Sequence, residues 1–214
     1  GLTGLYFFKE MKSNYLPHDF KDIMSYFYIS DKIKYVNIFK GKVFSSSELA
    51  NIIPEALVTS RYETYIIGDS STQVDGIIGL LDEFNAYYHS SKFSFDMLPI
   101  YKEIYPSDYL MEWVMELQSE MTAYHEFDFW IKEYILHSKI YYPELYYEIM
   151  KKDSAFQIYK DIRKKYKNLI SKYSSVVENE KVKMNYYYST EFWEDDYFRL
   201  IKRLSNKKYD FKNH

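Results

Sequence analysis

The chain has 214 residues, 47% of them hydrophobic, and a net charge of −3, so it can build a folded core and is not an intrinsically disordered chain. It contains no cysteine, which excludes disulfides, thiolate metal sites and cysteine nucleophiles, and which fits a cytoplasmic protein. No apolar run approaches the roughly 20 residues of a membrane-spanning helix, so we expect no membrane partner.

The first third of the chain combines helical and strand signals. Pro17 opens an expected first helix, and the residues of its apolar face are Phe20, Ile23, Met24 and Phe27. Residues 33–39 are rich in β-branched and aromatic side chains, and across Gly41 they can pair with residues 43–44 as a hairpin. Residues 45–47 can cap a short helix that Pro54 interrupts, and residues 62–68 are a second strand candidate. A small β element is therefore expected within residues 33–68.

The rest of the sequence is patterned as helices. Apolar residues between 74 and 88 keep a 3–4 residue period, and Gly76 and Gly79 would let another backbone come close. Ser107 opens a pattern of about 30 residues, which a break near residues 125–128 would bring closer to the usual helix length. Further helices are expected from Pro143 to residue 152, over residues 156–173 after a cap at Asp153, and from Ser189 or Thr190 to Leu204. We predict a mainly α, single-domain helical bundle over residues 1–214, with its helical core at 71–205.

Charge is distributed unevenly along this pattern. Residues 69–150 contain 15 acidic side chains and 4 lysines, whereas residues 151–214 contain 16 basic and 9 acidic side chains. The near-neutral total therefore conceals an acidic middle and a basic end. Such asymmetry bears on the choice of partners rather than on the fold.

Four carboxylates of the acidic middle share one helical spacing. We call Asp108, Glu112, Glu116 and Glu120, each four residues from the next, the acidic row. The row lies away from the apolar stripe of the same helix, so it should face outward, where its like charges disfavour the helix slightly. It is either a solvated face that keeps the protein soluble or a docking surface for a basic protein. Tyr109 and Tyr124 are candidates for the anchoring rings beside the row, whereas Trp113 is more plausible as a core residue.

The acidic row, the absence of cysteine and the Tyr- and Lys-heavy composition resemble, at the level of a class, the immunity proteins of bacterial contact-dependent toxin systems. The resemblance implies a non-enzymatic inhibitor that forms a stoichiometric complex in the cytoplasm and neutralises a basic toxin, such as a nuclease, by blocking its substrate cleft. The predicted contact residues are Asp108, Tyr109, Glu112, Glu116, Glu120 and Tyr124. No catalytic residue, metal or cofactor is expected.

Two other functions stay open. The first is a metal-dependent hydrolase that uses carboxylates and histidines of residues 108–137, namely Glu116, Glu120, His125, Glu133 and His137, although none of the usual metal motifs is present. The second is a nucleic-acid-associated regulator that acts through the basic segment at residues 151–172. Because lysine dominates that segment, we favour its packing beside the acidic helix, so that the two fields cancel and nucleic acid is not a partner.

Overall fold

The computed structural model describes residues 24–29, 32–37, 43–68, 71–152, 154–184, 196–207 and 211. The chain divides into two compact units. Unit 1 comprises residues 1–86, 130–162 and 209–214, and unit 2 comprises residues 87–129 and 163–208. The expected single domain over residues 1–214 stays a prediction.

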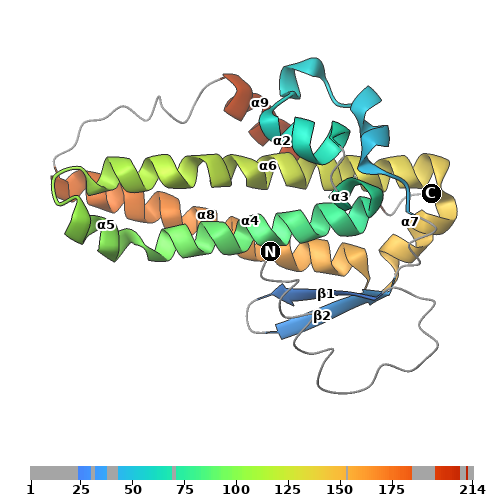
Figure 1. Ribbon diagram of the computed structural model, residues 1–214, viewed down its shortest axis with the longest axis horizontal. Coiled ribbons are helices and arrows are strands. Elements are labelled where there is room, and N and C mark those ends of the chain that lie inside the picture. The colour runs from blue at the N-terminus through green and yellow to red at the C-terminus, as the bar shows by residue number, and fades with distance from the viewer. Residues whose placement is uncertain are drawn as a thin grey trace. The chain divides into compact units, whose positions relative to one another are not determined.

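Helices dominate the described residues, which confirms a mainly α fold with a small β element in the first third of the chain (Figure 1). The strands are β1 (Met24–Ile29) and β2 (Lys32–Asn37). Short helical turns follow at η2 (Ser46–Asn51), η3 (Glu55–Leu57), α2 (Ser60–Tyr62), η4 (Glu63–Ile67) and α3 (Ser71–Val74). The longer helices are α4 (Gly76–Asp96), α5 (Leu98–Ile104), α6 (Tyr109–Tyr141), α7 (Pro143–Met150), α8 (Ala155–Met184) and α9 (Asp196–Ser205).

The β element is a hairpin that begins earlier than predicted. β1 and β2 pair antiparallel, with Tyr28 opposite Ile33, so the strand at residues 32–37 pairs with the chain before it and not with residues 43–44. The helix expected from Pro17 is wrong at Met24 and Phe27, which lie in β1, while Pro17, Phe20 and Ile23 lie outside the described residues. In β1, Phe27 and Ile29 are buried and alternate with the partly exposed Tyr28, which is the period of a strand.

The second predicted strand, at residues 62–68, is helical instead. Thr59 caps this segment because its side chain accepts a hydrogen bond from the backbone N–H of Tyr62. Tyr62 and Ile66 are both buried and lie four residues apart, so the segment buries one helical face. The predicted short helix before Pro54 is confirmed as η2, whose first turn the Ser45 hydroxyl caps.

The long pattern after residue 107 forms one unbroken helix, α6, of 33 residues. This agrees with the predicted pattern of about 30 residues, and the alternative of a break near residues 125–128 is not observed: buried polar side chains find partners there. His125 Nδ1 lies 2.7 Å from Ser205 Oγ, and Asp128 pairs with Arg163. A helix with satisfied polar groups has no reason to stop at them. The helices expected from Pro143 and over residues 156–173 are confirmed as α7 and α8, and the last expected helix is described from Asp196 as α9. The expected caps at Asp153 and at Ser189 or Thr190 lie outside the described residues.

In unit 1, the ring of Phe44 stacks on the ring of Tyr134, with centroids 3.9 Å apart and planes 6° apart. The Tyr134 hydroxyl donates to the carbonyl oxygen of Phe44 and accepts from its N–H, at 2.7 and 3.1 Å. Gly76, at the start of α4, has a φ of +53°, and a Cβ atom there would lie 2.4 Å from both the Phe44 carbonyl oxygen and the Tyr134 hydroxyl. The close backbone approach expected at Gly76 is confirmed.

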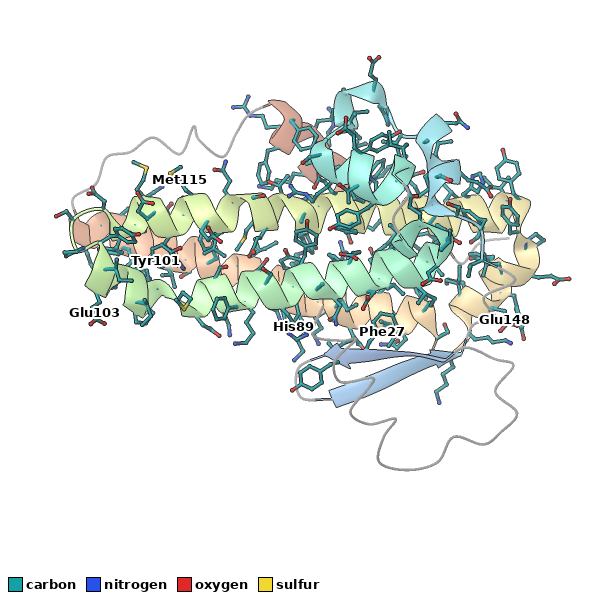
Figure 2. The ribbon with its side chains drawn as sticks, in the orientation of Figure 1. Phe27, His89, Tyr101, Glu103, Met115 and Glu148 are labelled. Carbon is teal, nitrogen blue, oxygen red and sulfur yellow. The ribbon has the colours of Figure 1, made fainter. Side chains whose placement is uncertain are left out.

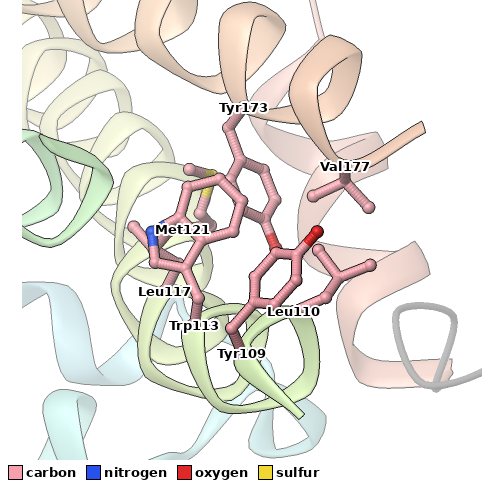
Figure 3. Close-up of a cluster of buried hydrophobic side chains, with 7 residues drawn as sticks. All are labelled: Tyr109, Leu110, Trp113, Leu117, Met121, Tyr173 and Val177. Atoms are coloured by element: carbon pink, nitrogen blue, oxygen red, sulfur yellow. The ribbon is translucent and has the colours of Figure 1, made fainter. Parts of the chain in front are cut away.

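The core of unit 2 joins α6 to α8 through large side chains (Figure 3). Its buried members are Tyr109, Leu110, Trp113, Leu117, Met121, Tyr173 and Val177. The Trp113 indole contacts the Tyr173 ring at 5.1 Å between centroids, and its N–H donates to the carbonyl of Ser94 at 2.8 Å. Trp113 is therefore a core residue, as predicted, and its polar atom is satisfied.

Candidate binding surface on helix α6

Three members of the acidic row are exposed in unit 2. Asp108 lies in the turn that leads into α6, and its carbonyl accepts the N–H of Glu112 at 3.1 Å. Glu112 and Glu116 follow on α6, both exposed. Among the described residues, none of these three carboxylates forms an ion pair. The chain's own described lysines therefore leave them uncompensated.

Glu120 departs from the row. Its side chain is half-buried, and its Oε1 accepts a hydrogen bond from the Ser90 hydroxyl on α4. Burial raises the pKa of this carboxyl, and the nearby charge of Glu116 adds to the effect. Since each step of four residues turns about 40° around an α-helix, three steps carry Glu120 roughly 120° away from Asp108 and toward the interior. The prediction that Glu120 faces outward with the others is wrong.

The two predicted anchoring rings are also buried. Tyr109 is 8% exposed, and its hydroxyl donates to Glu180 Oε2 at 2.6 Å. Tyr124 is 3% exposed and packs edge-on against Tyr166, with centroids 5.2 Å apart. Both rings belong to the interior of unit 2, so the expectation that they border the acidic row as contact residues is wrong.

Other large side chains of unit 2 lie beside the acidic row. The pKa of Tyr101 on α5 is raised mainly by burial and then by the charge of Glu116, with Glu112 as a smaller cause, so this ring lies beside the row. Tyr105, four residues later, has its ring centroid 6.0 Å from that of Tyr101 and is 45% exposed. Met115, which is 52% exposed, projects from the outer side of α6 (Figure 2). The sequence signals that could have found them are the i, i+4 tyrosine pair before Pro106 and a methionine between two acidic positions.

Behind the row, Glu180 on α8 is held by three donors. Besides Tyr109, Lys102 Nζ lies 2.8 Å from its Oε2, and Lys183 Nζ lies 2.8 Å from its Oε1. The hydrogen bonds from Lys102, Lys183 and Tyr109 lower the pKa of Glu180 to about 2, and burial together with Glu180 raises the pKa of Tyr109 to about 12. This cluster ties α5 and α6 to α8 within unit 2.

Glu180→Gln is expected to lower the stability of unit 2 at pH 7 by about 1–2 kcal/mol, allowing for the exposed lysine heads. The folded carboxyl has a pKa below its usual 4.5, so its contribution is complete above pH 4.5 and is lost as the pH falls toward 2. The difference in free energy of unfolding between the two proteins should therefore shrink over that range, as urea titrations at pH 7, 4.5 and 3 would measure. Glu178→Gln, at a mostly exposed neighbour paired with Lys181, is the control and should change little. An equal loss at pH 7 and pH 3 would contradict the assignment.

The basic segment at residues 151–172 is only partly neutralised. Lys151 pairs with Glu148 at 2.6 Å, and Arg163 Nε donates to Asp128 Oδ1 at 2.6 Å. The lysines at positions 164, 165, 167 and 172 are exposed and form no ion pair with a described residue. The expected cancellation by the acidic helix thus occurs at Arg163 and Asp128, and not between these lysines and the acidic row.

The residues of the hydrolase hypothesis do not assemble into a metal centre. In the part of the chain that the structure describes, no group of three His, Asp or Glu side chains could hold a metal ion. His125 contacts Ser205 in unit 2, while in unit 1 His137 Nε2 lies 3.4 Å from Glu48 Oε2. Glu133 is partly exposed. The geometry gives this hypothesis no support.

The comparisons with known proteins identify no relative. No family model, no curated protein and no solved structure matches the chain. Over the described residues, none of the helices combines the length and the apolar character that crossing a membrane demands.

Proposed function

We propose that the chain is a non-enzymatic protein-binding module that captures a basic protein through Asp108, Glu112 and Glu116. The observation that carries this proposal is that all three carboxylates are exposed and that no described lysine or arginine pairs with them. Like charges at this spacing disfavour the helix that carries them, and a basic partner would relieve that cost.

The neighbours of the row support the same function. Tyr105 and Met115 expose much of their apolar area in unit 2, and Tyr101 lies partly exposed beside Glu112 and Glu116. A tyrosine and a methionine next to charged groups are typical of an interface centre, where they supply contact area while the charges set orientation and association rate. The proposed contact surface therefore consists of three carboxylates and three large side chains.

The finer form of the proposal is an immunity protein. A row of carboxylates can occupy positions on a nuclease that otherwise hold substrate phosphates, and a cysteine-free chain suits the cytoplasm, where such a complex would form. In this form the chain binds its toxin stoichiometrically and prevents substrate entry. Basic toxins that are not nucleases would be captured by the same charges.

The test is charge reversal at the row. We expect Glu112→Lys/Glu116→Lys to weaken capture of the basic partner by about 100-fold or more, because two attractions become repulsions. The partner is first captured from an extract of the source organism, then purified, and its affinity, stoichiometry and salt dependence are measured by calorimetry. The reversed protein should keep its fold or gain stability, because the repulsions of Glu112 with Asp108 and of Glu116 with Glu120 become attractions.

The matched control is Glu55→Lys/Glu63→Lys, which makes the same change in net charge at two exposed positions of unit 1. This variant should keep most of the affinity. Equal losses in the two variants would show that only the net charge matters, and unchanged binding in the row variant would refute the proposed surface.

A further inference from the structure

We infer that unit 2 contains a binding site for a small organic phosphate, one with an aryl or short alkyl body, in a cavity between α6, α8 and α9. This inference does not depend on the acidic row. The cavity has a volume of about 340 Å³, within the range of small-molecule pockets.

One part of the cavity lining is apolar and aromatic. Met121 and Tyr124 come from α6, Tyr173 and Val177 from α8, and Phe198 from α9. The ring of Phe198 packs edge-on against His125, with centroids 5.4 Å apart, which ties α9 to α6 at this place. These surfaces would contact an apolar body and release water from it. A bare inorganic ion would leave most of this space without contacts.

The remaining lining carries a positive charge. Lys167 and Lys181 come from α8 and Lys202 from α9, while among the described residues of the lining Glu178 is the only carboxylate, and it pairs with Lys181 at 3.3 Å. Neither Lys167 nor Lys202 forms an ion pair with any described residue. Two lysines that no described carboxylate pairs with match the charge of a phosphate monoester, which is close to −2 at pH 7.

The polar and charged side chains that α8 contributes to the lining share one face of the helix. Lys167, Ser171, Ser174, Glu178 and Lys181 recur every three or four residues and so form one face. Lys165 and Lys172 lie on a different face of α8, because they are about 160° and 140° around the helix from Lys167, and they do not line the cavity. The chain therefore offers a matched pair of lysines for a control.

In the experiment the full chain is titrated separately with phenyl phosphate, inorganic phosphate and phenol, and calorimetry measures the affinity for each. We expect phenyl phosphate to bind at least tenfold more tightly than either of the other two, because only it uses both the lysines and the apolar lining. Lys167→Gln/Lys202→Gln should lose at least tenfold in affinity for phenyl phosphate, and Lys165→Gln/Lys172→Gln should lose less than twofold. The four lysines are exposed, so these variants should fold, and their urea midpoints check that they do.

Ser174→Trp supplies an independent arm, since it fills the cavity from an exposed position without a change in charge. It should abolish binding of phenyl phosphate. The inference is overturned by inorganic phosphate binding as tightly as phenyl phosphate, by equal losses in the two lysine pairs, or by unaltered binding in Ser174→Trp. The first two results would mean attraction to the basic face of α8 alone, and the third would place the ligand elsewhere.

Discussion

Arg163→Met is expected to destabilise unit 2 by about 3–5 kcal/mol, and Asp128→Asn by clearly less. The reason is the difference in burial between the two partners. The Asp128 side chain is fully buried, whereas the Arg163 side chain is 30% exposed. Without the guanidinium the carboxylate stays in the interior with less compensation, but without the carboxylate the guanidinium can turn toward water.

Urea unfolding at pH 7 measures both variants, together with the double variant Asp128→Asn/Arg163→Met. The double variant should be more stable than Arg163→Met alone, because the buried charge of Asp128 has then been removed together with its partner. Lys164→Met is the control, since it removes the same charge from the next residue of α8, which is exposed, and it should change the stability by less than about 0.5 kcal/mol. A larger loss in Asp128→Asn than in Arg163→Met would contradict the burial argument.

The helices were predictable because each buries a face whose residues recur within one turn. Trp113 and Leu117 on α6 are both fully buried at this spacing, and the pattern alone assigns them to the core. The prediction was wrong for residues 24–29 because Met24 and Phe27 fit a helical face, while Phe27 and Ile29 fit a strand face. Local spacing could not decide between the two, and pairing with β2 did.

The sequence predicted the exposed carboxylates of the candidate site but not the aromatic side chains beside them. The sequence shows that Glu112 and Glu116 share a face, which needs only helix geometry. It does not show that Tyr109 meets Glu180, because the two residues are 71 positions apart and the contact arises from packing of α6 on α8. Tyrosine fits a core and an interface equally well, so only the tertiary structure separates the buried Tyr109 from the exposed Tyr105.

Gly76→Ala is expected to destabilise unit 1 by about 2–5 kcal/mol through two separate effects. The φ of +53° at Gly76 lies in the left-handed region, which costs an alanine about 1–2 kcal/mol. The added Cβ would also lie 2.4 Å from the Phe44 carbonyl oxygen and from the Tyr134 hydroxyl, and relieving such overpacking costs about 1–3 kcal/mol more.

The clash should displace the stacked pair of Phe44 and Tyr134. Neither ring can move without loss of the hydrogen bonds between the Tyr134 hydroxyl and the Phe44 backbone. The experiment compares Gly76→Ala, Tyr134→Phe and the double variant by urea unfolding. Since Tyr134→Phe removes one of the two clashing atoms, adding Gly76→Ala to it should cost less than adding it to the original chain. Val74→Ala, at a position 68% exposed, is the control and should be nearly neutral. An additive double variant would mean that the backbone conformation and the contact with the Phe44 carbonyl oxygen, and not the contact with Tyr134, require glycine at this position.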